Sequence, residues 1–357
     1  MKLILIVTAV CLSIFAISCK TSAPVESNGL PAPTEAQVLY DFANKVVNPT
    51  YRDLNMKMQL LNTSVLELVA NSTSGNLEAA RIGWLNSRQV WEQSEAFLFG
   101  PVEDFNYDPA MDDWPVNHVD LDSLLASSNT LTAVDIDALP TSLKGFHPVE
   151  YILFGIGGSK QASQITDREK QYLIALTQNL VNVTATLRES WDPGKSDNFT
   201  TKFITAGSGS AIYASRKDAF IAMVAAMAGI CDEVSNSKIN EPFLAKDSTL
   251  EESQFSHNSI NDFTNNIAGM MNVYMGSYQE QGRSLYEIVA AKNISLANKI
   301  QSQINTSLSA MGKIDRNFGK AIFTHQSQIK ETQAALNSLT SLLENELMDF
   351  INKNIKD

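Results

Sequence analysis

His147 and Glu150 are the pair of side chains in this sequence with the clearest capacity for chemistry. They lie three positions apart within the stretch Gly145–Gly155, so on a helix the imidazole and the carboxylate project from one face and can share a ligand. Pro148 suits the first turn of a helix, and it disfavours the helical conformation at the residue before it. We therefore expect a helix that begins at Pro148, with His147 at its N-cap.

Two roles follow for Glu150, which would be the third residue of that helix. Its carboxylate can bond back to the backbone N–H of the N-cap residue, which is a purely structural role. It can also join His147 in a polar site beside the positive end of the helix. The two residues alone leave both roles open.

The same stretch resembles the signature of a known family. Gly145-x-His147-x-x-Glu150, followed by the apolar run Tyr151–Phe154, is similar to the motif of the imelysin-like proteins. Other segments resemble further parts of that family, in the expected order along most of the mature chain. They are a helix with Trp84, Arg88, Trp91, Glu92 and Glu95 that ends at Phe99-Gly100-Pro101, the loop Asp113-Trp114-Pro115, and the segment from Glu252 through Ser256 and Asp262 to Phe263.

The resemblance implies a protein of bacterial iron uptake that binds iron or an iron-containing ligand without catalysis. On the matching positions it implies His147, Glu150 and Glu95 as metal ligands or polar anchors. Arg88 would orient these carboxylates or hold an anionic chelator, because two helical turns separate it from Glu95 and place both on one face. The other residues of the ligand-binding pocket would be Trp84, Asp113, Trp114, Ser256 and Asp262.

A zinc-dependent peptidase that uses His147 and Glu150 is the alternative, since the family was grouped with metallopeptidases on its His-x-x-Glu motif. Such an enzyme needs about three protein ligands and an open position for water. A helical zinc peptidase has two histidines four positions apart, whereas this segment offers one histidine and Pro148 disturbs the helix. We therefore favour binding over hydrolysis, with iron as the metal and zinc as the alternative.

A structural interpretation of the same residues also stays open. Buried arginine and glutamate side chains must be paired wherever they occur, so a cluster of Arg88, Glu95 and Glu150 would then exist only to lock two groups of helices together. Replacement of His147 and Glu150 separates the interpretations. A structural network predicts a lower melting temperature with unchanged ligand binding, and a binding site predicts the reverse.

The N-terminus predicts export and a lipid anchor. Residues 1–18 contain one lysine and an apolar run, as in a secretory signal peptide, and are too short for a membrane span. Cys19 follows a small residue, as in lipoproteins whose first mature residue is an acylated cysteine, and residues 19–33 have the composition of a flexible tether. We expect a lipid anchor at Cys19 that holds the protein to a membrane.

The anchor places the protein in the cell envelope of a Gram-negative bacterium, in the periplasm or at the outer membrane. Membrane proteins of iron uptake are the expected partners. An ordinary secreted protein that is cut near the same position is the alternative.

Composition narrows the remaining functions. The formal net charge of −12 at pH 7 argues against binding to nucleic acid.

The remaining cysteine and histidines point to structural positions. Acylation of Cys19 would leave Cys231 with no disulfide partner, and the position of Cys231 at the end of an apolar run indicates a small core residue. The sequence has no Gly-rich phosphate loop and no Gly-x-Ser-x-Gly elbow. We expect His118, His257 and His325 at the surface or at helix ends.

Helical periodicity runs through the chain without sustained alternation of period two, so we expect an all-α fold. Thr34 caps the first helix, which breaks at Pro49. Further helices are expected at residues 54–69, 77–98, 165–191, 211–240, 259–279, 284–308 and 314–352. The resemblance implies two helical-bundle domains of about four helices each, packed side by side. With a boundary at Asp192-Pro193-Gly194, these domains span residues 34–194 and 195–357.

Residues 101–145 form a long connection rich in Asp, Asn, Pro and Ser, in which we expect one short helix near residues 119–125. Connections of this length are usually functional or poorly ordered. Because this one leads directly into His147, we expect it to wrap around the site and to help build it, with Trp114 as an anchor.

Overall fold

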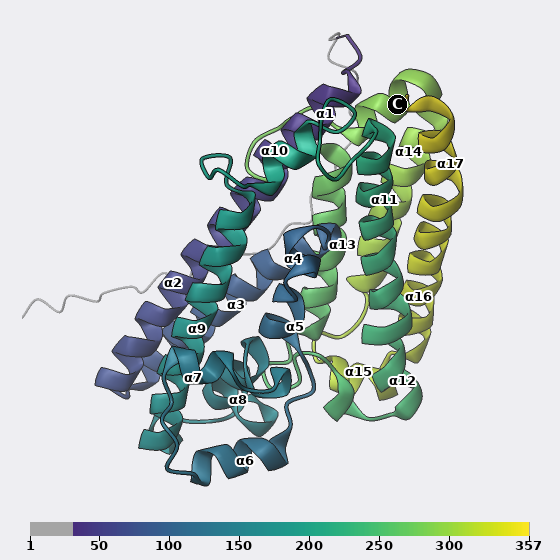
Figure 1. The fold of residues 1–357 in the computed structure, drawn as a ribbon. Helices are drawn as coiled ribbons and strands as arrows, with labels where there is room; N and C mark the ends of the chain where they lie inside the picture. Colours follow the sequence, from purple (N-terminus) through teal and green to yellow (C-terminus); the bar gives the residue numbers. More distant parts are fainter. Residues whose placement is uncertain (1–30, 357) are drawn as a thin grey trace, which may run out of the picture. The chain divides into compact units, whose positions relative to one another are not determined.

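Helices and their connections make up residues 31–356, which are the residues that the computed structural model describes. Within this range the only β pairing is an isolated bridge between Ser277 and Gln281. The prediction of an all-α fold is therefore confirmed (Figure 1). The predicted signal peptide, the lipidation site Cys19 and most of the tether lie outside the described residues. No helix in the described range has the length and apolar character that a membrane crossing needs.

The first helical segment is longer than predicted. Thr34 caps α1 (Glu35–Asp41) through a capping box with Gln37, as expected from the sequence. The helix then passes through a π-helical turn, Phe42–Val47, into α2 (Asn48–Ala70). The predicted break at Pro49 is wrong, because its missing N–H falls at the start of α2, where the wide turn already interrupts the α-helical pattern.

Three long helices and a short one that packs against two of them form the centre of the first group, which Figure 1 shows in purple to teal. α2 packs against α3 (Ser74–Ser94) and against α9 (Asp167–Trp191), and the short α8 (Phe146–Phe154) packs against both α3 and α9. α9 begins at Asp167, directly after its N-cap Thr166, which forms a capping box with Glu169, and it ends at Trp191, in agreement with the helix predicted at residues 165–191. This group therefore positions the His147 stretch.

The connection between residues 101 and 145 is more regular than predicted. It contains α4 (Pro101–Asp104), α5 (Tyr107–Asp112), α6 (His118–Ala126) and α7 (Ala133–Asp137). Only α6 was expected. Helices of four to six residues are too short to produce a periodic pattern, and local caps such as the Thr132–Asp135 capping box define them instead.

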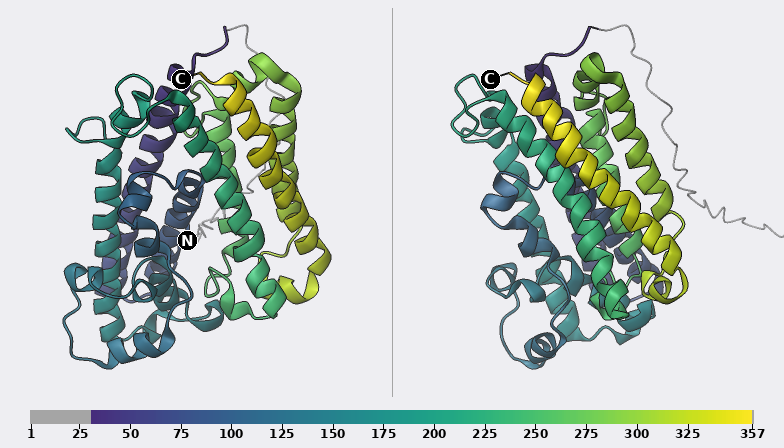
Figure 2. Two further views of the ribbon diagram at one scale, coloured as in Figure 1. Left: turned by 45° about the vertical axis from the view of Figure 1, so that its right-hand side comes forward. Right: turned by 90° about the vertical axis from the view of Figure 1, so that its right-hand side faces the viewer.

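The second group contains the helices drawn in green to yellow (Figure 2). α13 (Ser259–Met275) packs against α14 (Leu285–Met311), α14 against α16 (Gln326–Ser341), and α16 against α11 (Arg216–Glu233). The group also contains α12 (Asn240–Ala245), α15 (Phe318–Thr324) and α17 (Met348–Asn354). The short α10 (Phe199–Ile204) packs instead against α1, the π-helical turn after it and α9. The predicted single helix at residues 314–352 is wrong, because the backbone at His325 is not helical and separates α15 from α16.

α3 and α13 join the two groups at close range. A Cβ atom at Gly269 would lie 2.1 Å from the backbone oxygen of Gln93, so only glycine permits the two helices to approach this far. From Ala32 onwards the chain forms one compact unit. The division into two domains near residue 194 stays a prediction.

Candidate functional site

The turn that begins α8 is set by Gly145. Its φ of +88° lies in the region that favours glycine, and a Cβ there would lie 2.1 Å from the backbone oxygen of Met111. Gly145 is therefore the N-cap, and α8 begins at Phe146. The prediction of His147 as N-cap is wrong by two positions, and Pro148 stays in the first turn, where its missing N–H leaves no hydrogen bond unmade.

Glu150 is bonded on both of its oxygens. Oε2 lies 3.0 Å from Nδ1 of His147, as the spacing predicted. Oε1 accepts hydrogen bonds from the backbone N–H of Phe255 (3.0 Å), the backbone N–H of Ser256 (2.7 Å) and the Ser256 hydroxyl (2.7 Å). The capping-box role is therefore wrong, since Glu150 fastens a segment more than a hundred residues away to α8.

The other nitrogen of His147 faces Asp112 at the end of α5. Nε2 lies 3.0 Å from Asp112 Oδ1 but is not aligned for a hydrogen bond. Burial lowers the pKa of His147, but the carboxylates of Asp112 and Glu150 outweigh that effect and raise it to about 9. Asp112 also accepts hydrogen bonds from the Arg88 guanidinium and, at 2.6 Å, from the Trp91 indole N–H. Burial raises the pKa of Asp112, and Arg88 more than reverses this, so it falls below the ordinary value.

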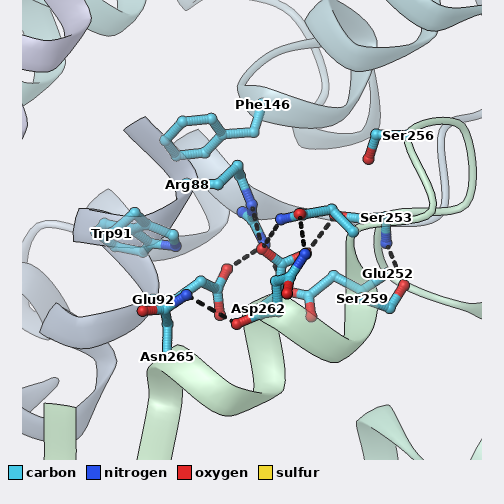
Figure 3. A network of polar contacts seen from close by, with 12 residues as sticks. Arg88, Trp91, Glu92, Phe146, Glu252, Ser253, Ser256, Ser259, Asp262 and Asn265 are labelled. Carbon is cyan, nitrogen blue, oxygen red and sulfur yellow. Dashed lines mark hydrogen bonds and ion pairs between the residues drawn. The ribbon is translucent and has the colours of Figure 1, made fainter. Parts of the chain in front are cut away.

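Arg88 occupies the centre of the cluster (Figure 3). Its guanidinium pairs with Glu92, with Glu252 at 3.0 Å and with Asp262 at 3.5 Å, in addition to Asp112. The ring of Phe146 lies against it, with the ring centre 5.0 Å from Cζ. Burial lowers the pKa of Arg88, but the four carboxylates raise it well above the ordinary value, so this positive charge is permanent.

Lys238 is the second buried cation. It ends a π-helical turn, Val234–Lys238, and its Nζ lies 2.9 Å from Glu95 Oε2, 3.0 Å from Glu252 Oε1 and 3.6 Å from Glu92 Oε2. The ring of Trp114 lies over it, 5.3 Å from Nζ. Burial lowers the pKa of Lys238, and the three carboxylates raise it well above the ordinary value.

Negative charge exceeds positive charge in this cluster. Two permanent cations and one histidine face the buried carboxyl groups of Glu92, Glu95, Asp112, Glu150, Glu252 and Asp262. Burial raises the pKa of Glu92 and of Glu95 well above the ordinary value, and raises that of Asp262 to about 6. Buried carboxylates in such excess must bind protons or a cation.

Three donor groups in the described range have ligand atoms close enough to share one metal ion, all within 4.8 Å of one another. They are Glu92–Glu252–Asp262, Glu92–Glu95–Asp112 and Asp112–His147–Glu252. Arg88 pairs with every member of the first group, and Lys238 pairs with two members of the second. The third group contains the histidine, and there His147 Nε2 and Glu252 Oε2 are buried without a hydrogen-bond partner.

The structure brings most of the predicted site residues together. His147, Glu150, Arg88, Glu95, Ser256 and Asp262 all belong to the cluster. Trp84 contacts the helix that carries His147, because its indole N–H donates to the backbone oxygen of Phe146 at 2.9 Å. The ring of Trp114 lies 6.3 Å from that of His147.

Asp113 lies outside the cluster. It is half-buried and accepts a hydrogen bond from the Thr141 hydroxyl at 2.5 Å, whereas its neighbour Asp112 points into the cluster. The sequence reasoning also missed Lys238 and gave no role to Glu92 or Glu252, although both stand in the family-like segments. The available signal for Lys238 was a lysine within the largely apolar helix predicted at residues 211–240, since a buried lysine needs carboxylate partners.

Cys231 is a core residue, as predicted. It is fully buried, its thiol donates to the backbone oxygen of Leu336 at 3.4 Å, and burial raises its pKa to about 12. A thiol of this kind is neither nucleophile nor metal ligand at neutral pH.

Comparison with known proteins relates this chain to a family. The family model for imelysin matches residues 47–345 of the chain. Iron-regulated protein A of Synechococcus elongatus is 26% identical over 320 residues, which cover 88% of this chain and 86% of that protein.

Solved structures agree with that relation. One from Parabacteroides distasonis, named as an iron-regulated protein A precursor, aligns with a TM-score of 0.80 and 26% identity over 93% of this chain and 98% of its own. An imelysin-like protein from Psychrobacter arcticum aligns with a TM-score of 0.73 over 90% of this chain and 98% of its own. Its sequence identity is 15%, so that second likeness concerns the fold alone.

Proposed function

This chain belongs to the imelysin family, and we propose that it is a non-enzymatic binding protein of iron uptake that takes up iron, or an iron-containing ligand, at Asp112, His147 and Glu252. These residues come from both groups of helices, since α5 and α8 carry the first two and the segment before α13 carries the third. The name of the Synechococcus elongatus relative, iron-regulated protein A, supports iron as the metal.

The excess of buried carboxylates is the observation that carries this proposal. Arg88 pairs with Asp112 and Glu252 of the third donor group as well, and Lys238 with Glu252, so the two cations are shared among all three groups. Six buried carboxyl groups therefore face only these two cations and a proton on His147. A metal ion in the third group would replace that proton and would give His147 Nε2 and Glu252 Oε2 the partners that they lack.

The donor atoms fit iron. One imidazole nitrogen and carboxylate oxygens suit a hard or borderline ion, and thiolates, which select softer metals, do not occur in the group. Glu150 orients the imidazole ring of His147, since its Oε2 accepts a hydrogen bond from Nδ1 and so leaves Nε2 for the metal. Glu150 is thus a positioning residue in this proposal rather than a ligand.

The burial of the donors favours binding over hydrolysis. A catalytic zinc keeps an open position for water, and a peptide bond must reach it. Asp112, His147 and Glu252 are only 2%, 1% and 2% exposed, and a single imidazole is present. A polypeptide substrate has no access to donors that are buried to this degree.

The anchor and the location of the protein also belong to this proposal. The signal peptide, acylation at Cys19 and the tether rest on the sequence pattern of the N-terminus. An acylated cysteine would hold the binding unit at a membrane of the cell envelope, within reach of membrane proteins of iron uptake. A mass spectrum of the purified protein that lacks the acyl mass on Cys19 would exclude the anchor.

Metal analysis and calorimetric titration test the binding function. The chain without residues 1–30 keeps the whole compact unit and is titrated with Fe²⁺ in the absence of oxygen, with Fe³⁺-citrate and with Zn²⁺. We expect one iron per chain, no binding by His147→Ala and at least tenfold weaker binding by Asp112→Asn. Asp113→Asn is the matched control, because the Asp113 carboxylate lies outside the cluster. The affinity of this variant for iron should equal that of the wild type.

Two results would contradict the proposal. Absence of binding by the wild type, or equal binding by the His147→Ala and wild-type chains, would remove the metal site. A peptide-library assay is run in parallel, and zinc-dependent cleavage that His147→Ala abolishes would establish a hydrolase instead.

A further inference from the structure

Lys238 is in an unusual position for a lysine. Its side chain is fully buried, and it ends the π-helical turn Val234–Lys238 between α11 and α12. A π turn inserts one extra residue into a helix, and such turns occur often at functional sites. A buried ammonium group is unfavourable unless carboxylates surround it, so its location needs a reason.

The contacts of Nζ resemble those of a bound cation. Carboxylate oxygens of Glu95, Glu252 and Glu92 lie 2.9, 3.0 and 3.6 Å from it. The face of the Trp114 ring covers it at 5.3 Å. The ammonium group therefore lies among the same oxygens that a metal ion would use.

The donor group around it is complete enough to hold an ion. The ligand atoms of Glu92, Glu95 and Asp112 lie within 4.8 Å of one another. The side chain of Asn266 adjoins them, since its amide nitrogen donates to Glu92 Oε2 at 2.7 Å and to Glu95 Oε2 at 2.6 Å. Its oxygen Oδ1 is buried without a hydrogen-bond partner. Three carboxylates suit a divalent cation, and a half-turn of the Asn266 amide would direct its oxygen, in place of its nitrogen, toward them.

We propose that Lys238 holds the place of a second divalent cation in the Glu92–Glu95–Asp112 group, so that the chain binds a single ion and an uncharged residue at position 238 creates a second site. The count of one ion rests on the function proposed above. The role of Lys238 does not depend on which metal the protein carries in the cell. Because Asp112 belongs to both groups, its carboxylate would bridge the two ions.

Titration with Mn²⁺ tests this proposal, since Mn²⁺ accepts oxygen and imidazole ligands and is visible by electron paramagnetic resonance. The wild type, Lys238→Met and Lys238→Arg are compared in the chain without residues 1–30. Methionine keeps most of the aliphatic stem and removes the charge, whereas arginine keeps the charge. We expect one ion for the wild type, two for Lys238→Met and one for Lys238→Arg. The spectrum of the doubly loaded variant should show exchange coupling through the shared carboxylate.

The outcomes separate this proposal from the function on which it rests. If the wild type binds no ion and Lys238→Met binds one, the role of Lys238 stands and the metal-binding function fails. If the wild type binds one ion and Lys238→Met also binds one, the function stands and the role of Lys238 is overturned. Two ions in the wild type would overturn it as well.

Loss of Lys238 leaves repelling carboxylates in the core, so the variant is also followed by circular dichroism. If Lys238→Met is unfolded in metal-free buffer, added Mn²⁺ must restore the helical signal, because the ion would replace the missing charge. Failure of Mn²⁺ to restore it would overturn the proposal.

Discussion

Replacement of Glu150 by alanine should destabilise the protein, because this carboxylate fastens the segment before α13 to α8. Its Oε1 accepts three hydrogen bonds, from the backbone N–H groups of Phe255 and Ser256 and from the Ser256 hydroxyl. Glu150 is fully buried, so water does not take over these bonds. The substitution therefore leaves several donors without an acceptor.

The magnitude follows from the number of donors that lose their acceptor. A buried donor left without a partner costs about 1–3 kcal/mol, and removal of one partner of a buried ion pair costs about 3–5 kcal/mol. We expect a loss of about 3–5 kcal/mol in the free energy of unfolding, since the contributions are not additive. At roughly 2 °C for each kcal/mol, the melting temperature should fall by about 6–10 °C.

Thermal unfolding in the presence of EDTA measures this effect without a contribution from bound metal. The control is Glu67→Ala, which removes an exposed glutamate from α2 and should change the melting temperature by less than about 1 °C. Hydrogen exchange should accelerate at the amides of Phe255 and Ser256 in the Glu150 variant. A melting temperature of the Glu150 variant within 2 °C (about 1 kcal/mol) of the wild type would show that Glu150 does not fasten this segment to α8.

Three further predictions follow from groups around the cluster. Burial raises the pKa of Glu251 from 4.5 to about 8. As the pH rises from 4.5 to about 8, Glu251 has lost its proton in the unfolded chain but keeps it in the folded chain. The free energy of unfolding should therefore fall by about 1.4 kcal/mol per pH unit in this range, and Glu251→Gln should remove this contribution to the slope in denaturant titrations. Gly269→Ala would force a Cβ against the Gln93 backbone and should lower stability by about 1–3 kcal/mol, measured by urea unfolding. Chelation should lower the melting temperature of the iron-loaded protein, because an ion at 100 times its Kd contributes about 2.7 kcal/mol, and unchanged melting would mean that iron does not bind the folded state.

The fold could be predicted where local signals were strong. The cap at Thr34 and the stop after Trp191 define helix ends by short-range chemistry, and the structure has both where the sequence predicted them. The errors at Pro49 and His325 are opposite in kind. A proline can sit inside a longer helical segment when a π turn precedes it, and a histidine can interrupt a helix without any Gly or Pro to mark the break.

The site could be predicted in part, because its residues are spread along the chain. The spacing of His147 and Glu150 predicted their contact, and the family resemblance added Arg88, Glu95 and Asp262. Spacing could not show whether Asp112 or Asp113 enters the cluster. Which of the two carboxylates is buried depends on how the chain turns at the end of α5. Lys238 was missed because its carboxylate partners Glu92 and Glu95 are distant in sequence, so that only the packing of the folded chain brings them to it.

Anomalous X-ray diffraction from crystals of the iron-loaded chain, recorded on both sides of the iron absorption edge, tests the central claim most directly. The account predicts one strong iron peak bonded to Nε2 of His147 and to carboxylate oxygens of Asp112 and Glu252. A peak bound only by exposed carboxylates, or no peak between these three residues in iron-saturated crystals, would contradict it.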